Sequence, residues 1–280
     1  MELRGRDARR VGDRPIEVLD QVTGTLTVDD ATGVITTADL DGGRTPVPDL
    51  PGLSLRGGWG RSLAGRIGPQ RTLLHSLLED LGGAFLVSGY ALLREGGIPD
   101  DPDRGPEIAE YQADVCIGWA RGGEMVTLLS TRGHQAVPYG PAASPTLLDA
   151  DAWHAVEPTT ASTVRRVRRL DVTPSSPGGL AVEAHFRDSY TGDDPEMALH
   201  EYLVEADVDA AGALSTIDVD ARVLPWASCP GAVASAQGVV GVRIGELAAM
   251  AREALRGPTT CTHLTSTIRS LADAGHLADL

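Results

Sequence analysis

Four side chains in the last third of the sequence are of types that bind metal ions or transfer protons. They are His200, Cys229, Cys261 and His263. Two cysteines and two histidines are the ligand types of a tetrahedral zinc site, and a neutral imidazole can also act as a general base. Their spacing does not match a zinc finger or a zinc ribbon. We therefore expect either zinc or another divalent metal held by all four side chains, or an acid–base pair formed by His200 and His263.

Each of these residues also has a purely structural interpretation. Free cysteines are among the most buried residue types, and a histidine that faces a core is more often hydrogen-bonded there than catalytic. The alternative is therefore a non-catalytic ligand-binding or assembly module in which these cysteines and histidines are structural. A redox sensor acting through Cys261 is a third interpretation.

The elements that must position these residues are strands followed by helices. Apolar and polar residues alternate over 180–187, 198–208 and 214–223, which is typical of half-buried strands. His200 falls on the apolar side of the second of these strands, so its side chain should point inward. Strands followed by helices predict an α+β fold rather than a doubly wound sheet.

Two helices are expected after these strands. One apolar stripe with helical spacing follows Gly245, and another begins at about Thr262. Cys261 and His263 then lie at the start of the second helix. Unpaired N–H groups and the positive end of the helix dipole at such a position lower the pKa of a thiol and favour a neutral imidazole.

An internal repeat organises the whole chain. Residues 30–52 and 209–231 align without gaps, with nine identities in 23 positions. The same three residues recur further along each half, as Arg66-Ile67-Gly68 and as Arg243-Ile244-Gly245. Opposite His200, Cys229, Cys261 and His263 the first half has Gln21, Leu50, Ala84 and Leu86. We therefore predict two related halves packed as a pseudo-twofold pair, of which the second alone has kept a site.

The repeat predicts three parts of the chain. A degenerate N-terminal repeat spans 1–98, a central insert or linker spans 99–162, and a C-terminal repeat with the candidate site spans 163–280. The insert is expected to form two strands within 108–131. A segment between two halves could also cover a pocket at their interface, and an ordinary strand with a buried Cys and Trp is the alternative.

The first half should be a truncated copy of the second. It keeps a hairpin at about 22–41 and two helical segments near 69–80 and 84–94. It is expected to lack the two opening strands of the second half.

Composition excludes several kinds of chemistry. The 280 residues include no Lys and no Asn. Without Lys the chain cannot form a Schiff base, anchor pyridoxal phosphate or build a P-loop. It also has no Gly-x-Gly-x-x-Gly, Gly-x-Ser-x-Gly or His-Glu-x-x-His motif. We expect an enzyme of lyase or hydrolase type that acts on a small oxygenated substrate, with no nucleotide or pyridoxal phosphate cofactor.

The charge balance bears on partners and location. A net charge of −15 has the wrong sign for nucleic-acid binding. The one cationic cluster, Arg165–Arg169, is expected to be a solvated strand with Arg on both faces. Clearly apolar runs such as Ala84–Val87 are far shorter than a membrane span. Three cysteines without a secretory signal indicate reduced thiols. We expect a cytoplasmic protein with neither nucleic acid nor membrane as a partner.

The C-terminal half resembles a bacterial family known as domain of unknown function 2889. The likeness covers about 163–275 and is carried by five short segments: Arg165–Leu170, Leu199-His200-Glu201, Cys229-Pro230-Gly231-Ala232, Val239–Gly245 and Cys261-Thr262-His263-Leu264-Thr265. The resemblance implies that His200, Cys229, Cys261 and His263 belong to the family pattern. It implies no particular reaction.

Overall fold

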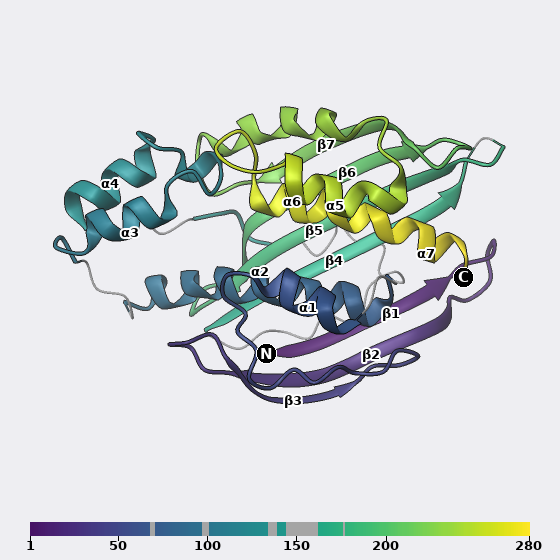
Figure 1. Cartoon of the computed structure of the whole chain (residues 1–280), viewed down its shortest axis with the longest axis horizontal. Coiled ribbons are helices and arrows are strands. Elements are labelled where there is room, and N and C mark those ends of the chain that lie inside the picture. Colours follow the sequence, from purple (N-terminus) through teal and green to yellow (C-terminus); the bar gives the residue numbers. More distant parts are fainter. Residues whose placement is uncertain (68–70, 97–100, 134–138, 144–161, 176) are drawn as a thin grey trace. The chain divides into compact units, whose positions relative to one another are not determined.

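The computed structural model is a mixed α/β structure with two antiparallel sheets and, in the part that it describes, seven α-helices (Figure 1). The described residues are 1–67, 71–96, 101–133, 139–143, 162–175 and 177–280. They divide into two compact units. The first contains Met1–Leu86 and Gly275–Leu280, and the second contains Val87–Ala143 and Thr159–Ala274. The α+β content expected from the sequence is confirmed, and the duplication is not.

The first unit is built on a three-stranded antiparallel sheet with the order β1-β2-β3. Its strands are β1 (Glu2–Arg9), β2 (Glu17–Val28) and β3 (Ile35–Asp41). The predicted hairpin is β2 and β3, whereas β1 was not predicted. Its inward positions hold Leu3, Gly5 and Asp7, so β1 lacks the apolar alternation by which a strand is recognised.

Two helices pack on the core of this sheet, α1 (Trp59–Ile67) and α2 (Leu73–Arg94). The prediction of two separate helical segments near 69–80 and 84–94 is wrong, because α2 is one helix that continues through Gly82. A Cβ at Gly82 would lie 3.0 Å from Cδ1 of Trp59. This glycine therefore allows a close approach to Trp59 and does not end the helix.

Helix α2 is long and apolar enough to cross a membrane by length and composition alone. Core helices of soluble proteins pass the same test. Leu74, Leu78 and Leu81 are buried in the core of the first unit, and Val87 and Ala91 are buried in a cluster of the second. Packing within the described residues buries 22% of the apolar window of α2.

The second unit is built on four long antiparallel strands in the order β4-β5-β6-β7. They are β4 (Thr163–Pro174), β5 (Leu180–Thr191), β6 (Met197–Val208) and β7 (Leu214–Val223). The last three match the three strands expected from alternation. Their apolar face forms the largest core of the chain, which includes Phe186, Tyr202 and Val204.

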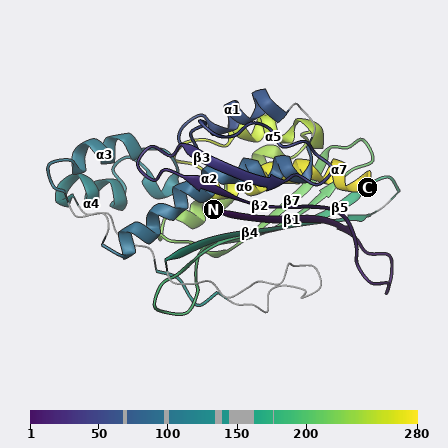
Figure 2. The same ribbon diagram turned by 90° about the horizontal axis from the view of Figure 1, so that it is seen from below.

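Helices α5 (Ile244–Ala254) and α6 (Thr262–Ser270) cover this apolar face (Figures 1 and 2). A 3-10 segment, η3 (Cys229–Val239), leads from the sheet to α5. After α6 the chain continues through η4 (Leu271–Asp273) into α7 (Ala274–Ala278). The two helices expected after the strands are therefore present at the predicted positions.

The central segment forms helices between residues 105 and 132, so the prediction of two strands within 108–131 is wrong. It forms α3 (Gly105–Gln112), a 3-10 turn η1 (Ile117–Trp119) and α4 (Glu124–Arg132). Pro106 lies in the first turn of α3, and Gly133 ends α4 in a left-handed conformation with φ of 62°. Residues 134–138 and 144–161 of the predicted insert lie outside the described residues.

A similar turn follows the last strand of each sheet, but at positions that differ from the sequence alignment. Gly52 donates its N–H to the Ile35 carbonyl, and Gly241 donates to the Leu214 carbonyl. Both glycines have a left-handed φ, of 86° and 88°. The alignment instead paired Gly52 with Gly231. A shared turn alone does not establish a duplication.

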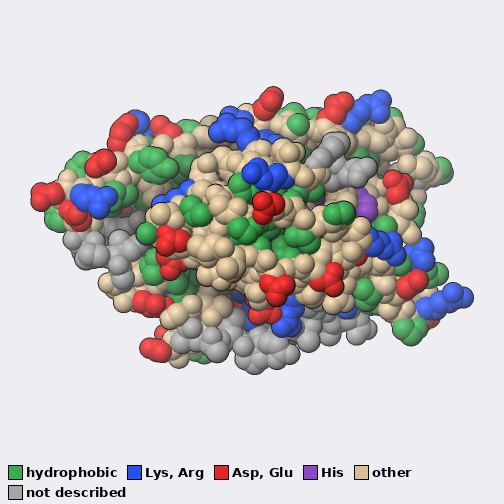
Figure 3. Space-filling model, turned by 60° about the horizontal axis from the view of Figure 1, so that its bottom comes forward, with side chains coloured by type: hydrophobic (Ala, Val, Ile, Leu, Met, Phe, Trp, Pro, Cys, Tyr) green, Lys and Arg blue, Asp and Glu red, His purple; other side chains and the backbone are tan. Residues whose placement is uncertain are grey.

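Charges of both signs are mixed on the surface. On the face drawn in Figure 3, arginine and acidic side chains are interspersed, with hydrophobic side chains scattered between them.

Candidate functional site

Three charged or ionisable side chains form a row across the apolar face of the four-stranded sheet. Arg166 on β4 lies opposite Asp188 on β5, and Asp188 lies opposite His200 on β6. Directly opposite residues of antiparallel strands have Cβ atoms about 4.5–5.5 Å apart on the same face. The next row along the sheet is Phe186 and Tyr202, so the polar row borders the core.

A β-bulge lies next to this row. Asp188 pairs with His200, but the following pair is Ser189 with Ala198, which leaves Leu199 as an extra residue on β6. Bulges are frequent beside active sites, where they redirect a side chain. The register is unbroken from the pair Leu180 and Val208 to the pair Asp188 and His200, so His200 lies on the core-facing side, as its position in the alternating pattern predicted.

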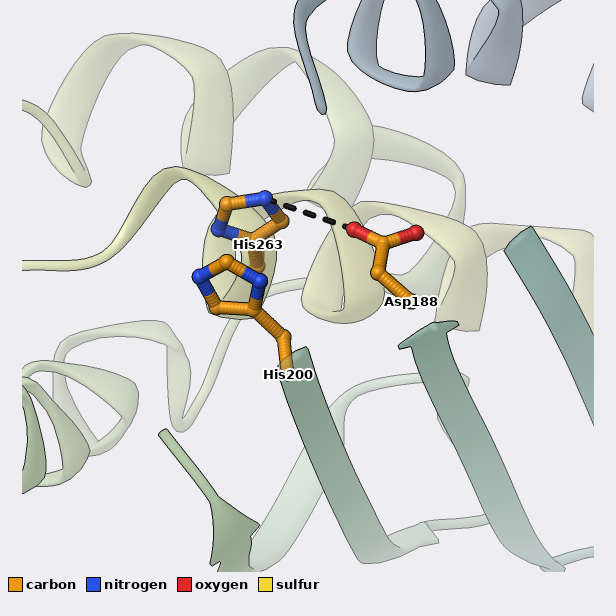
Figure 4. Close-up of side chains that lie close together, drawn as sticks. All are labelled: Asp188, His200 and His263. Atoms are coloured by element: carbon orange, nitrogen blue, oxygen red, sulfur yellow. Dashed lines mark ion pairs between the residues drawn. The ribbon is translucent and has the colours of Figure 1, made fainter. Parts of the chain in front are cut away.

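His263 completes the group from the first turn of α6. Its ring stacks on that of His200, with 3.6 Å between ring centroids and 22° between the planes. Its Nε2 atom is 3.4 Å from Oδ2 of Asp188 (Figure 4). One ligand atom of each of Asp188, His200 and His263 lies within 4.8 Å of the other two. Three separate elements thus bring a carboxylate and two imidazoles together.

Arg166 holds the carboxylate of Asp188 in a two-pronged ion pair. Its Nε donates to Oδ1 and its Nη2 donates to Oδ2, each at 2.8 Å. The two side chains are only 6% and 0% exposed. The prediction of a merely solvated Arg-rich strand is therefore wrong for this residue. The guanidinium also lies 4.9 Å from the ring centroid of Phe186.

Both histidines are held in the neutral form. Burial lowers the pKa of His200 to about 4, with a further decrease from the charge of Arg166 and an opposing effect of Asp188. Burial also lowers the pKa of His263 well below its ordinary value, and His200, Arg166 and Arg168 add to that decrease. Neutral imidazoles offer a lone pair to a metal ion or to a proton.

One buried polar atom of the group, Nδ1 of His200, has no hydrogen-bond partner among the described residues. Burial and the neighbouring thiol of Cys261 raise the pKa of the Tyr202 hydroxyl, which lies beside the group. Tyr90 of α2 also borders the group, with its ring centroid 6.4 Å from that of His200. Unpaired buried polar atoms are costly, and a bound ion or ligand would offset that cost at this site.

Of the two cysteines in the predicted ligand set, Cys261 lies against the group and Cys229 lies outside it. Cys261 has its Sγ 3.7 Å from Nδ1 of His263, on the opposite side of that ring from Asp188. Cys229 is buried but does not belong to the group of Asp188, His200 and His263. Burial raises the pKa of Cys229 to about 12, so this thiol keeps its proton.

The opposite face of the sheet holds a separate buried polar cluster. Glu201 on β6 accepts a hydrogen bond from Nε of Arg187 at 2.7 Å and lies 3.3 Å from Nε2 of His185. Because side chains alternate along a strand, His185 faces away from Asp188 although both belong to β5. His185 therefore provides a matched control for His200 and His263.

Two members of the site, Asp188 and Arg166, were not predicted from the sequence. The inward series Leu180, Val182, Ala184 and Phe186 continues to Asp188, so a carboxylate on the apolar side of a strand was the available signal. Arg166 lies two residues before Arg168 within the Arg-rich strand, and both reach the inward side.

Comparison with known proteins identifies a family for the C-terminal part alone. Residues 164–276 match the family model described as protein of unknown function (DUF2889), which confirms the resemblance found in the sequence. The matched range contains Arg166, Asp188, His200 and His263. Neither the curated proteins nor the solved structures contain a match to the chain.

Proposed function

We propose that the DUF2889 domain formed by residues 164–276 binds one divalent transition metal through Asp188, His200 and His263. The observation that carries this proposal is the convergence of three ligand atoms within 4.8 Å of one another from β5, β6 and α6. This ligand set differs from the four side chains expected from the sequence, because the carboxylate of Asp188 replaces the thiols of Cys229 and Cys261.

The residues present fit such an ion. Two imidazoles and a carboxylate suit zinc and other first-row divalent metals, and three protein ligands leave open positions for water or substrate. Nδ1 of His200 has no hydrogen-bond partner among the described residues, and a bound ion would supply one. If the ring turned, its other nitrogen, Nε2, would face the ion instead. The low pKa of both histidines keeps their lone pairs free from competing protons at neutral pH.

Charge around the site favours an oxygen anion as the further ligand. Arg166 and Asp188 cancel each other, and the two histidines are neutral. A divalent ion would therefore leave the buried site with net positive charge, which hydroxide or a negatively charged substrate oxygen would balance. Arg168, whose guanidinium lies 5.1 Å from the Phe186 ring, adds to the positive field.

The reaction class that follows is hydrolysis or elimination on a small oxygenated substrate. When bound, a divalent metal polarises a substrate oxygen and lowers the pKa of a bound water. Arg166 fixes the carboxylate, and the stacked rings hold each other in place. The net charge of −15 supports a small molecule rather than a nucleic acid as the partner.

Metal content of the protein purified without a His tag tests this function. We expect about one equivalent of a transition metal per chain, and a large loss of metal in the H200Q and H263Q variants. The H185Q variant removes a buried histidine from the other face of the sheet and should keep its metal. Less than about a tenth of an equivalent in the wild type, even after incubation with zinc, would contradict the proposal.

A non-catalytic role is the second candidate. The Arg166 and Asp188 ion pair is already complete, with very little exposed surface, which is also what a structural polar cluster requires. This candidate predicts that H263Q lowers the melting temperature without changing any phenotype of the host. A phenotype at unchanged stability would favour the enzyme.

We further propose that the two strand-and-helix units arose by duplication. The matching turns at Gly52 and Gly241 support this origin, as does the part of the sequence repeat that aligns 30–41 with 209–220.

A further inference from the structure

Cys261 directly precedes α6 and lies against the ring of His263. Its Sγ is 3.7 Å from Nδ1, while the other ring nitrogen, Nε2, is 3.4 Å from Oδ2 of Asp188. The two nitrogens of His263 therefore face different partners. Nε2 faces the carboxylate that would share the metal, and Nδ1 faces the thiol.

The position of Cys261 is one at which helices prefer another residue. Its backbone is extended, with φ of −121° and ψ of 132°, as is usual for the residue that caps a helix start, but its side chain makes no capping hydrogen bond. Ser, Thr, Asp or Asn would cap α6 better. A residue that breaks a local preference is expected where function requires it.

A neutral imidazole carries one proton, and its location decides what each nitrogen can do. Beside the charged carboxylate of Asp188, the proton is favoured on Nε2 when no metal is bound. To bind a metal through Nε2, His263 must carry its proton on Nδ1 instead. A thiol can weakly donate to Nδ1 in the first state and weakly accept from it in the second.

We infer that Cys261 is a positioning residue that stabilises the metal-binding tautomer of His263, an inference that rests on the proposed function. When a metal binds, the ring would release its Nε2 proton to solvent and take up one proton from solvent on Nδ1, so the ring stays neutral and the number of protons on it is unchanged. Sγ of Cys261 then accepts the Nδ1–H bond and fixes the ring. Partners of this kind typically change metal affinity by about 10–100-fold.

Zinc titration of the full chain tests this role with three variants. C261A removes the partner of Nδ1 and should weaken zinc binding by about 10–100-fold. C261S keeps a group that donates and accepts, and should retain more affinity than C261A. C229A deletes another buried thiol without touching His263, and should bind zinc like the wild type. Equal affinity of C261A and wild type would overturn the inference and leave the proposed function standing.

Two spectroscopic measurements distinguish a positioning role of Cys261 from a role as a metal ligand or as a merely structural thiol. Nitrogen-15 NMR of histidine-labelled protein should show His263 with its proton on Nε2 without metal and on Nδ1 with zinc. A proton on Nε2 in the zinc form would overturn the inference even if C261A does not fold. Cobalt(II) titration should give no intense sulfur-to-cobalt charge-transfer band. Such a band would show that Cys261 is a metal ligand and not a positioning residue. Absence of any metal binding by the wild type would overturn both the proposed function and this inference.

Discussion

The imidazole rings of His200 and His263 stack with 3.6 Å between their centroids, although one ring projects from a strand and the other from a helix. Two positively charged imidazoles at this distance would repel each other strongly in a buried setting. The contact is therefore compatible with neutral rings, in agreement with the lowered pKa of each.

The stability of the metal-free protein should fall as the pH decreases from about 6.5 toward 4. Unfolded histidine takes up a proton near pH 6.5, whereas folded His200 does so only near pH 4 and folded His263 well below its ordinary value. Below 6.5 the unfolded chain thus binds more protons, and each histidine contributes up to about 1.4 kcal/mol of lost stability per pH unit. Urea unfolding in the presence of EDTA measures this slope. The H200Q/H263Q double variant should have a clearly smaller slope, and an unchanged slope would show that the two rings are not neutral in the folded state.

Removing Arg166 should be strongly destabilising. In R166M the carboxylate of Asp188 stays buried without its cation, and breaking a buried ion pair in this way costs about 3–5 kcal/mol. Urea unfolding of R166M measures the loss. The R166M/D188N double variant should recover part of it, since no buried charge is left unpaired.

An exposed pair of similar geometry provides the control for Arg166. Arg121 donates to both oxygens of Glu110 at 2.6 and 2.8 Å, but these side chains are 57% and 67% exposed. R121M should cost less than about 1 kcal/mol. Equal losses in R121M and R166M would be inconsistent with a buried ion pair at Asp188.

Two tyrosine hydroxyls should respond differently to deletion. Among the described residues the buried Tyr202 hydroxyl has only the weakly hydrogen-bonding thiol of Cys261 as a hydrogen-bonding neighbour, so Y202F should change stability by less than about 0.5 kcal/mol. The Tyr190 hydroxyl donates to Oε1 of Glu95 at 3.2 Å, so Y190F should lose about 1 kcal/mol. Thermal unfolding of the two variants checks the difference. A large loss in Y202F would reveal a partner for this hydroxyl, such as a bound water.

The two matching turns should respond alike to substitution. Gly52 and Gly241 have φ of 86° and 88°, and a Cβ at either position meets no atom within 4 Å. G52A and G241A should therefore each lose about 1–2 kcal/mol from backbone strain alone. Gly65, within α1, is the control, because G65A should gain up to about 1 kcal/mol in a helix. Unequal losses at the two turns would argue against their structural equivalence.

Sequence patterns were sufficient to find β5, β6, β7 and the helices α5 and α6 that cover them, and to direct His200 toward the core. Alternation reports which side of a strand faces the core, and this information is local. The repeat drew attention to His200 and His263 because the first half lacks both. Neither pattern could show that the two rings stack, since that contact depends on where α6 crosses β6.

Asp188 and Arg166 were missed because their role depends on strand pairing. Each occupies an inward position on its own strand, but only the registers of β4 with β5 and of β5 with β6 bring them beside His200. The second register runs unbroken along β5 and β6 up to Asp188 and His200 and shifts only beyond this pair, at Leu199. The helices of the central segment were missed for another reason, since short apolar runs do not distinguish strands from helices.

Anomalous diffraction at the zinc absorption edge, from crystals of the untagged protein grown with zinc, tests the proposed metal site most directly. We predict one strong peak at about 2.0–2.2 Å from a carboxylate oxygen of Asp188 and from one ring nitrogen of each of His200 and His263. A peak coordinated by Cys229 and Cys261 instead, or no peak beside Asp188, would contradict this assignment.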